Sequence, residues 1–322
     1  MKRVLITETM HACAFDILGA RNDIEIINLK GDIRPETLIA HMPGVHAIAV
    51  RSAHLTADVL SHANDLEIVS RHGVGCDLID VDYLSGRGIP VAIAAGANSL
   101  SVAEHTLALM LATARELPAQ DKMAKGGNWK NRNDFRLRDL RGATILIVGF
   151  GRIGRLVAPL CTAFGMNVIA ADIAPDYALA EQMGIRLITD FRDALPEADY
   201  VTLHVPLDDK TRHLVSAAEF AAMKNGVILI NCARGGIVDD DAMLAALDSG
   251  KVFAAGIDVL DREPPEPGHP ILQRDDVIVT PHNGAASISS SIAMARMAAE
   301  NILDCFDGRL KDDMIFNLDG LR

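Results

Sequence analysis

One stretch of the sequence, from Thr144 to Asp172, constrains the fold more than any other. An apolar run rich in β-branched residues (144–148) leads into Gly149-Phe150-Gly151-Arg152-Ile153-Gly154, and a helical pattern follows. A second apolar run (167–171) then ends on Asp172. This order of strand, glycine turn, helix, strand and acid is the fingerprint of a dinucleotide-binding βαβ unit. The sequence therefore predicts a parallel α/β sheet here.

The glycines and the acid of this fingerprint have separate tasks. Gly149 permits a tight turn, Gly151 lets the backbone approach a diphosphate, and Gly154 allows the helix to pack closely on the strand. Unpaired N–H groups at the start of the helix would attract the phosphates. Asp172 is placed to accept hydrogen bonds from an adenosine ribose and would repel a 2′-phosphate. Since Ile173-Ala174-Pro175 supplies no cation, we expect NAD rather than NADP.

Composition narrows the class of protein. The chain has 322 residues, of which 49% are hydrophobic and 23% charged, as in a globular protein large enough for two domains. A net charge of −12 argues against nucleic acid or an anionic membrane surface as a partner. We expect no secretory signal and no membrane span, because every apolar run is too short. Five widely spaced cysteines without a CxxC indicate a reducing cytoplasm, with no disulfide framework and no metal site.

The first ninety or so residues alternate short apolar strands with helical stretches, which predicts βαβ units and a mostly parallel sheet. A long helix over 101–116 is apolar on nearly every face, so we expect it to be buried between domains or subunits. Residues 118–143 break the rhythm and predict an extended arm that contacts another subunit. The expected strands cover 4–7, 24–29, 47–50, 66–70 and 90–93, and the expected helices cover 11–20, 35–41, 57–63 and 81–87.

The fingerprint opens a second α/β domain, and three of its later strand ends carry ionisable residues. Ligands bind at the carboxyl ends of strands in open parallel sheets. Arg234 leaves one strand into a glycine turn, where its guanidinium could grip a carboxylate. Asp258 ends the next strand, and His282 follows the last one, where Glu263 could orient the imidazole for proton transfer. The expected strands lie near 144–148, 167–171, 185–188, 200–203, 227–231, 253–257 and 277–280, before a last helix over 287–305.

These segments together resemble the D-isomer-specific 2-hydroxyacid dehydrogenases. Residues 51–52, 98–104, the glycine fingerprint, 231–239 and 281–285 match segments of that family in order. The resemblance implies two Rossmann-like, doubly wound parallel-sheet domains. One is a flavodoxin-like catalytic domain at residues 1–98 and 289–322, and the other an inserted NAD-binding Rossmann domain at 99–288. It also implies an active site in the cleft between them, closing by hinge motion.

The resemblance also implies a role for each site residue. His282 would exchange a proton with the substrate oxygen, and Glu263 would hold its imidazole. Arg234 would grip the α-carboxylate while hydride passes between C2 and the nicotinamide, whose carboxamide would meet Asp258. The cofactor would contact Gly149, Gly151, Arg152, Ile153, Gly154, Asp172, His204, Pro206, Thr211, Cys232, Ala233, Arg234, Asp258, His282 and Gly284. The substrate would contact Arg51, Ser52, Val74, Gly75 and Arg234.

Within the family, residues 50–53 and 231–239 are most similar to 3-phosphoglycerate dehydrogenases, in which Arg51 would meet a phosphate. We expect a short form without the regulatory domain that many of them carry. Hydroxypyruvate or glyoxylate reduction and a sulfolactate-type substrate stay open, because Arg-Ser here also occurs in members with uncharged substrates. Formate dehydrogenases share the fold but carry an amide in place of Glu263. NAD-sensing corepressors share it too, as interaction proteins. The resemblance implies a homodimer through residues about 101–141.

Overall fold

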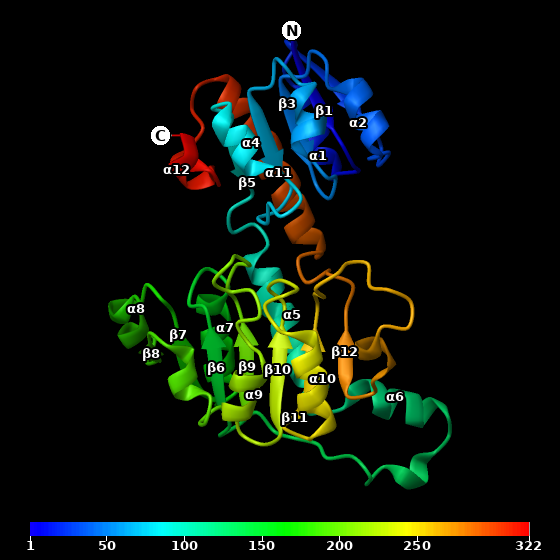
Figure 1. Cartoon of the computed structure of the whole chain (residues 1–322), viewed down its shortest axis with the longest axis vertical. Coiled ribbons are helices and arrows are strands. Elements are labelled where there is room, and N and C mark those ends of the chain that lie inside the picture. The colour runs from blue at the N-terminus through cyan, green and yellow to red at the C-terminus, as the bar shows by residue number, and fades with distance from the viewer. Residues whose placement is uncertain (322) are drawn as a thin grey trace. The chain divides into compact units, whose positions relative to one another are not determined.

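The protein consists of two compact units in the computed structural model, which describes residues 1–321 (Figure 1). Unit 1 comprises residues 1–98 and 286–322, and unit 2 comprises residues 99–285. The expected end of the second domain, at residue 288, differs from the end of unit 2 by three residues. Residues just after Ala285 lead into a helix that packs on unit 1, and the buried Ser290 near its start donates a hydrogen bond from its Oγ to the carbonyl of Ala97.

The sheet of unit 1 has five parallel strands in the order β2-β1-β3-β4-β5. This is the flavodoxin-type order, in which the direction of winding reverses between β1 and β3. The carboxyl ends of those two strands therefore flank the point where such sheets bind ligands. The strands are β1 (Lys2–Ile6), β2 (Ile24–Asn28), β3 (Ala47–Val50), β4 (Ile68–Arg71) and β5 (Val91–Ile93).

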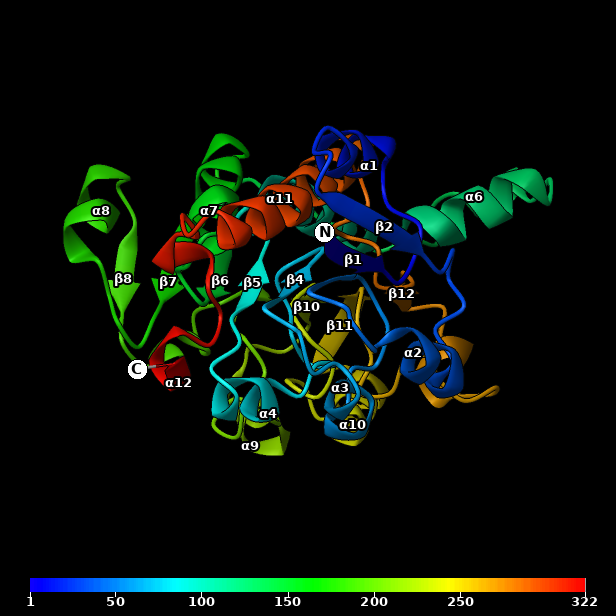
Figure 2. The ribbon, with the colours of Figure 1, turned by 90° about the horizontal axis from the view of Figure 1, so that it is seen from above.

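Helices cover both faces of this sheet, as Figure 2 shows from above. Because side chains alternate along a strand, Val4 and Ile6 face one helical layer while Leu5 faces the other. The first layer holds α1 (Ala12–Gly19) and α11 (Ile288–Phe306), and the second holds α2 (Pro35–His41), α3 (Ala57–Ser61) and α4 (Val81–Gly86). The remaining elements of the unit are the 3-10 turn Asp312–Met314 and α12 (Leu318–Leu321).

The sheet of unit 2 has seven parallel strands in the order β12-β11-β10-β9-β6-β7-β8. This is the Rossmann order, extended by one strand, and its winding reverses between β6 and β9. The predicted fold of two doubly wound parallel sheets is confirmed. The strands are β6 (Thr144–Val148), β7 (Asn167–Ala171), β8 (Arg186–Ile188), β9 (Tyr200–Leu203), β10 (Val227–Asn231), β11 (Val252–Ile257) and β12 (Val277–Val279).

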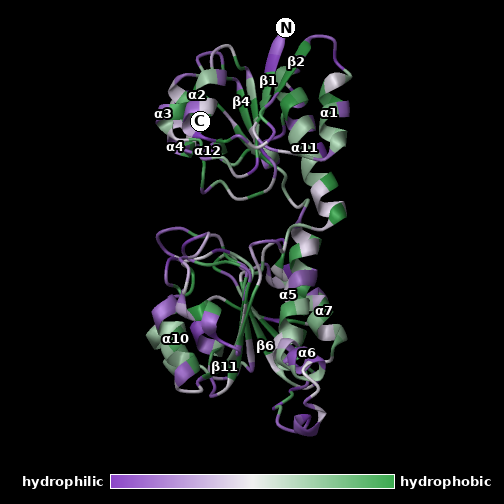
Figure 3. Cartoon of the chain, turned by 90° about the vertical axis from the view of Figure 1, so that its right-hand side faces the viewer, coloured by the Kyte–Doolittle hydropathy of each residue, from purple (hydrophilic) through white to green (hydrophobic). Residues whose placement is uncertain are grey.

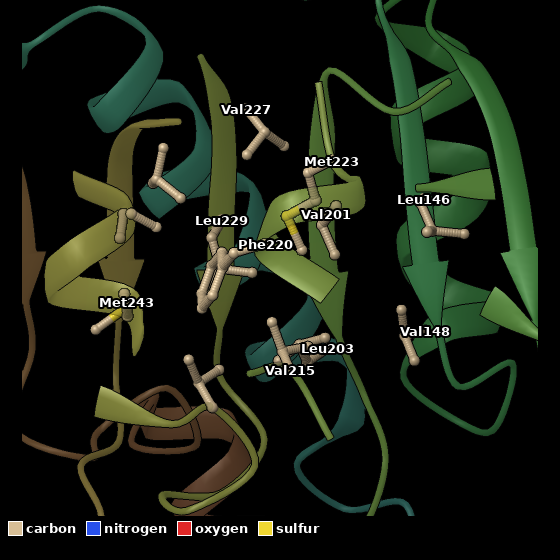
Figure 4. Packing of buried hydrophobic residues seen from close by; sticks show 14 of the residues in the cluster. Leu146, Val148, Val201, Leu203, Val215, Phe220, Met223, Val227, Leu229 and Met243 are labelled. Atoms are coloured by element: carbon tan, nitrogen blue, oxygen red, sulfur yellow. The ribbon is translucent and has the colours of Figure 1, made fainter. Parts of the chain in front are cut away.

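Two apolar layers enclose the sheet of unit 2. On one face, Phe220 and Met223 from the α9 side pack with Val201 and Leu229 of the strands, as Figure 4 shows. The helices of this unit include α10, whose outer surface is hydrophilic in Figure 3. They are α5 (Ser99–Ala114), α6 (Leu117–Lys125), α7 (Gly154–Ala163), α8 (Tyr177–Gln182), α9 (Ala217–Ala222) and α10 (Asp240–Asp248), with 3-10 turns at Trp129–Asn131, Phe191–Ala194 and Pro270–Gln273.

The long apolar helix α5 is buried within unit 2. Its buried residues lie in the same cluster as β10 and β6, and a Cβ placed on Gly256 of β11 would lie 2.9 Å from Leu109 Cβ. Glu104 and Ala108 remain exposed. The helix is apolar on most of its surface because it packs on strands β10, β11 and β12 and on helix α7.

The expected extended arm over 118–143 begins with a helix instead. Helix α6 buries no residue, so it lacks the apolar periodicity by which sequence analysis detects helices. Lys125 and Asp121, one turn apart, form an exposed ion pair at 2.7 Å that supports it locally. Trp129 follows, and 65% of its surface is exposed. No helix within residues 1–321 is both long and apolar enough to cross a membrane.

Candidate active site

The glycine turn after β6 is packed tightly on its inner side and open on its outer side. A Cβ on Gly149 would lie 2.5 Å from the carbonyl oxygen of His204, where the winding of the sheet reverses. A Cβ on Gly154 would lie 2.1 Å from the carbonyl oxygen of Gly149. Gly151, by contrast, has no atom within 4 Å of its Cβ position. The turn thus requires glycine at two positions for its own packing and leaves open space at the third.

The start of α7 faces this open space without a side-chain cap. Helix α7 begins at Gly154, and no side chain accepts a hydrogen bond from its first turn. Arg155 Nε instead supports the turn by donating to the carbonyl of Phe150 at 2.8 Å. Uncapped N–H groups and the positive end of the helix dipole suit a diphosphate. The residues present therefore fit the diphosphate of a dinucleotide, with Arg152 and Ile153 between the glycines.

Asp172 connects the end of β7 to the glycine turn. Its Oδ2 accepts a hydrogen bond from Phe150 N at 2.7 Å, and its Oδ1 accepts one from Ala174 N at 2.9 Å. Each carboxylate oxygen can accept a second hydrogen bond, so the side chain can still bind both hydroxyls of a ribose. Ile173 beside it is 95% exposed and supplies no charge.

The residues expected near the adenine lie at the end of β9 and in the following turn. The His204 ring is buried, its Nε2 lies 3.0 Å from Thr202 Oγ1, and its Nδ1 has no partner among the residues that the structure describes. Burial lowers the pKa of His204 to about 3, so the ring is neutral. Any contact of His204 with a cofactor would use its backbone. Pro206 and Thr211 do share one turn, since Thr211 Oγ1 donates to the Pro206 carbonyl at 2.7 Å.

Asn231 shapes the turn that carries Arg234. Its Oδ1 accepts from Ala233 N at 3.0 Å, and its Nδ2 donates to the Arg234 carbonyl at 3.0 Å. Arg234 Nη1 donates to the carbonyl of Ala233 at 2.7 Å, which orients the guanidinium. A Cβ on Gly235 would lie 1.9 Å from the Leu260 carbonyl oxygen, so only glycine fits there. Cys232 is buried, and burial raises the pKa of its thiol to about 12, which leaves it protonated.

The structure brings His282 and Glu263 together. His282 Nδ1 lies 2.6 Å from Glu263 Oε2, and Glu263 Oε1 accepts from Leu260 N at 2.9 Å. Partial burial would raise the pKa of Glu263, but the hydrogen bonds from His282 and Leu260 and the charge of Arg234 outweigh it and hold the pKa below its ordinary value. His282 has a φ of +50°, in the left-handed region that non-glycine residues rarely adopt. Such strain is concentrated at functional sites.

Asp258 accepts several hydrogen bonds from the residues around His282. We call residues 280–284 the His282 loop. The carboxylate is 3% exposed and accepts from Thr280 Oγ1 at 2.6 Å, from Asn283 N at 3.0 Å and from Gly284 N at 2.9 Å. The carbonyl of Asp258 accepts from His282 N at 2.8 Å. Sequence reasoning assigned Asp258 to the cofactor and missed its role in holding this loop, as well as the contribution of Thr280.

In unit 1, Arg51 and Ser52 follow β3 at the switch point of the sheet, where they contact Glu8 from the end of β1. Glu8 is 7% exposed. It accepts from Arg51 N at 2.9 Å, from Ser52 Oγ at 2.6 Å, and from Ser52 N and Thr7 Oγ1. Both donors of Ser52 are therefore engaged by Glu8. Sequence reasoning missed Glu8, although an acid directly after the first strand was a usable signal.

Val74 and Gly75 belong to a loop held by Arg71. Arg71 Nε donates to the Gly75 carbonyl at 2.8 Å, and its Nη1 donates to the His72 carbonyl at 2.6 Å. Burial, and then the positive charges of Arg51 and Arg71, lower the pKa of His72. Arg51 and Arg71 therefore both act on His72. Over residues 1–321, no cluster of three or more His, Cys, Asp or Glu side chains is arranged to bind a metal ion.

Comparison with known proteins agrees with this geometry. Residues 107–284 match the family model described as D-isomer specific 2-hydroxyacid dehydrogenase, NAD binding domain. A D-3-phosphoglycerate dehydrogenase of Methanocaldococcus jannaschii is 39% identical over 98% of this chain and 59% of its own length. A hydroxypyruvate reductase of Thermotoga maritima is 36% identical over 94% of this chain and 97% of its own.

A solved structure, of a protein from Thermus thermophilus, superposes with a TM-score of 0.89 at 34% identity, covering 98% of this chain and 99% of that one. The chain spans a little under three fifths of the length of the phosphoglycerate dehydrogenases that it matches, 59% in the Methanocaldococcus example. The glycine turn with its acid, the His282–Glu263 pair and these matches lead to one conclusion. The chain belongs to the D-isomer-specific 2-hydroxyacid dehydrogenase family.

Proposed function

We propose that the protein is an NAD-dependent dehydrogenase that interconverts a D-2-hydroxy acid and the corresponding 2-keto acid. The observation that carries the proposal is the 2.6 Å contact between His282 and Glu263 in the same unit as the glycine turn. In this proposal unit 2 binds the cofactor and unit 1 recognises the substrate.

The cofactor assignment rests on Asp172. Its carboxylate lies against the glycine turn through Phe150 N and would repel a 2′-phosphate, which favours NAD over NADP. The diphosphate would be held by the uncapped start of α7 and the open face at Gly151. When NADH is bound, its nicotinamide ring supplies the hydride that reduces a 2-keto acid at C2.

The protein side chains would move the proton and hold the substrate. Because Glu263 occupies Nδ1 of His282, Nε2 is the nitrogen that would give a proton to the substrate oxygen and later take it back. Glu263 stabilises the imidazolium that exists before the proton leaves. Arg234, whose positive charge acts on Glu263 of this pair, would bind the α-carboxylate through its planar guanidinium.

For the substrate we propose 3-phosphoglycerate and 3-phosphohydroxypyruvate. Relatives with the name D-3-phosphoglycerate dehydrogenase support this choice, and so does the position of Arg51, whose backbone N–H is held by Glu8 at the switch point of the sheet of unit 1. Hydroxypyruvate is the second candidate, since a relative that this chain matches over nearly its full length is named hydroxypyruvate reductase. Glyoxylate and a sulfolactate-type acid are the next candidate substrates. An NAD-sensing interaction protein without turnover is the remote alternative.

NADH oxidation at 340 nm with a panel of keto acids tests the proposal. The panel holds 3-phosphohydroxypyruvate, sulfopyruvate, hydroxypyruvate, glyoxylate and 2-ketoisocaproate. A preference for 3-phosphohydroxypyruvate that Arg51→Ala removes supports the phosphoglycerate assignment. The matched control is Arg34→Ala, an exposed arginine of the same unit paired with Asp32. A wild-type preference for hydroxypyruvate that Arg51→Ala leaves intact would refute that assignment, and no turnover at all would refute the enzymatic function.

We further propose a cytoplasmic homodimer formed through residues about 101–141. The exposed apolar side chains of Leu117 and Trp129 in this segment support the contact. The five cysteines are free thiols in the structure, which suits a reducing compartment. Light scattering of the wild type and of Trp129→Ser tests the assembly, and a wild-type monomer at micromolar concentration would contradict it.

A further inference from the structure

The His282 loop contacts helix α5, to which none of the roles above assigns a part in the chemistry. Ser101 Oγ donates to the carbonyl of Gly284 at 2.8 Å. His105 lies one turn further along the helix, and its Nε2 is 3.0 Å from Thr280 Oγ1 and 3.4 Å from Asp258 Oδ1. Residues of helix α5, of the end of strand β11 and of the His282 loop, which are far apart in the sequence, are thus in contact with one another.

The hydrogen-bond chemistry fixes the direction of this chain of contacts. Thr280 has one hydroxyl proton, and at 2.6 Å from Asp258 Oδ1 that proton goes to the carboxylate, which can only accept. Towards His105 the hydroxyl oxygen can then only accept, so His105 Nε2 must carry a proton and donate it. Hydrogen bonds therefore lead from His105 to Thr280 and from Thr280 to Asp258. His105 Nε2 also lies 3.4 Å from Asp258 Oδ1.

The ring of His105 also contacts the loop directly. A Cβ on Gly284 would lie 3.1 Å from His105 Cδ2 and 2.9 Å from Asp258 Oδ2, so the loop backbone is held closely between these two side chains. Asp258 in turn accepts the N–H groups of Asn283 and Gly284. His282, whose backbone has the unfavourable φ of +50°, lies in the chain between Thr280 and this anchor. A strained backbone persists only where its surroundings hold it.

We propose that His105 is a positioning residue for His282, acting through Thr280 and Asp258. By donating from Nε2 it orients the Thr280 hydroxyl towards Asp258, and by packing on Gly284 it prevents the loop from relaxing. His105 itself would touch neither substrate nor cofactor. The inference rests on the proposed dehydrogenase function for its kinetic consequence, but its structural consequence can be measured without turnover.

Three variants of the full chain test the proposal. His105→Phe removes the donor and keeps a ring, while His105→Gln restores an N–H close to the position of Nε2. Thr113→Val is the control, because Thr113 is a buried threonine of the same helix whose hydroxyl donates to carbonyls of α5 itself. Two readouts are used: hydrogen exchange of the amides of residues 282–284, and kcat together with the Kd for NADH.

In His105→Phe, we expect these amides to exchange roughly fivefold faster, the factor that corresponds to one net hydrogen bond. We expect kcat to fall roughly tenfold to a hundredfold, because small displacements of a reacting group are costly, with the Kd for NADH unchanged. His105→Gln should restore both values to near those of the wild type. A melting temperature lowered in His105→Phe, with loop exchange and kcat no different from those of Thr113→Val, would reduce His105 to a packing residue and overturn the proposal.

A double-mutant cycle with Thr280→Val separates a linked chain from independent effects. If His105 acts through Thr280, the double variant should be no slower than the worse single variant. Additive losses, or a His105→Gln variant as slow as His105→Phe, would overturn the hydrogen-bond chain. If the wild type turns over none of the keto acids, the proposed function fails, while faster loop exchange in His105→Phe alone would still support the positioning role and unchanged exchange would refute it.

Discussion

Nδ1 of His282 and Oε2 of Glu263 lie 2.6 Å apart, although 19 residues separate them in the chain. The contact leaves Nε2 as the nitrogen able to exchange a proton. The pKa of Glu263 lies below its ordinary value, so the group is a carboxylate at neutral pH and can accept a hydrogen bond from His282 Nδ1. The pair therefore has the arrangement of a general acid with its orienting base.

Replacing His282 removes the proposed proton donor. We expect His282→Ala to lower kcat by roughly 10²–10⁴, the usual contribution of general acid–base catalysis, without changing the affinity for NADH. Steady-state kinetics and NADH fluorescence titration measure the two quantities. The control is His62→Ala, an exposed histidine of unit 1. A His282→Ala variant that reacts at the wild-type rate would eliminate the assignment.

Arg234→Lys separates charge from geometry. The lysine keeps the positive charge but cannot donate two parallel hydrogen bonds to a carboxylate. We expect kcat/KM to fall roughly tenfold to a hundredfold, corresponding to the loss of about 1.5–3 kcal/mol from a charge-assisted hydrogen bond. Arg186→Lys, at an exposed arginine paired with Glu197, should leave kcat/KM unchanged. Equal values for the two variants would remove Arg234 from the substrate site.

The Asp172→Ala substitution should weaken the binding of NADH more than the binding of NADPH. The alanine loses the ribose contact and also the repulsion of a 2′-phosphate, so the ratio of the two dissociation constants shifts towards NADPH. The ratio is informative because Asp172 also accepts from Phe150 N and Ala174 N, and loosening of the glycine turn affects both cofactors alike. Equal weakening of both cofactors would mean that Asp172 supports only the turn.

Glu8 should make the stability of unit 1 depend on pH. Burial alone would raise the pKa of Glu8, but the donors from Ser52, Thr7 and Arg51 outweigh it and hold the pKa below its ordinary value of 4.5. The stabilisation is then complete above about pH 4.5 and is lost as the pH falls through the lower pKa of the folded state.

Glu8→Gln should abolish this contribution and destabilise the protein by about 1–3 kcal/mol at pH 7, because an amide cannot accept from all these donors. Urea unfolding between pH 3 and pH 7, with Glu36→Gln at an exposed position as control, measures the effect. If the wild type and Glu8→Gln lost stability in parallel as the pH falls, the predicted role of Glu8 would be contradicted.

The strands were predictable because they are buried on both faces and so appear as continuous apolar runs, as in residues 144–148 and 227–231. Helix α6 was not, because nothing in it is buried. Arg234, Glu263 and His282 were predictable as polar residues at strand ends. Their supports were not, since Thr280 reaches Asp258 across 22 residues and His105 reaches Thr280 across 175, and no local pattern records such pairs.

Helix α11 determines the order in which the chain can fold during synthesis. Ala295, Ala299 and Ile302 of this helix complete an apolar layer with Val4 and Ile6. Ser70 Oγ bonds to the carbonyl of Ala298 across the same layer. Unit 1 therefore cannot close its core until the helix has left the ribosome, whereas unit 2, which is continuous in sequence, can fold before it. The sheet of unit 1 is synthesised first but completed last, and until α11 packs on it one of its apolar faces stays uncovered and prone to aggregation.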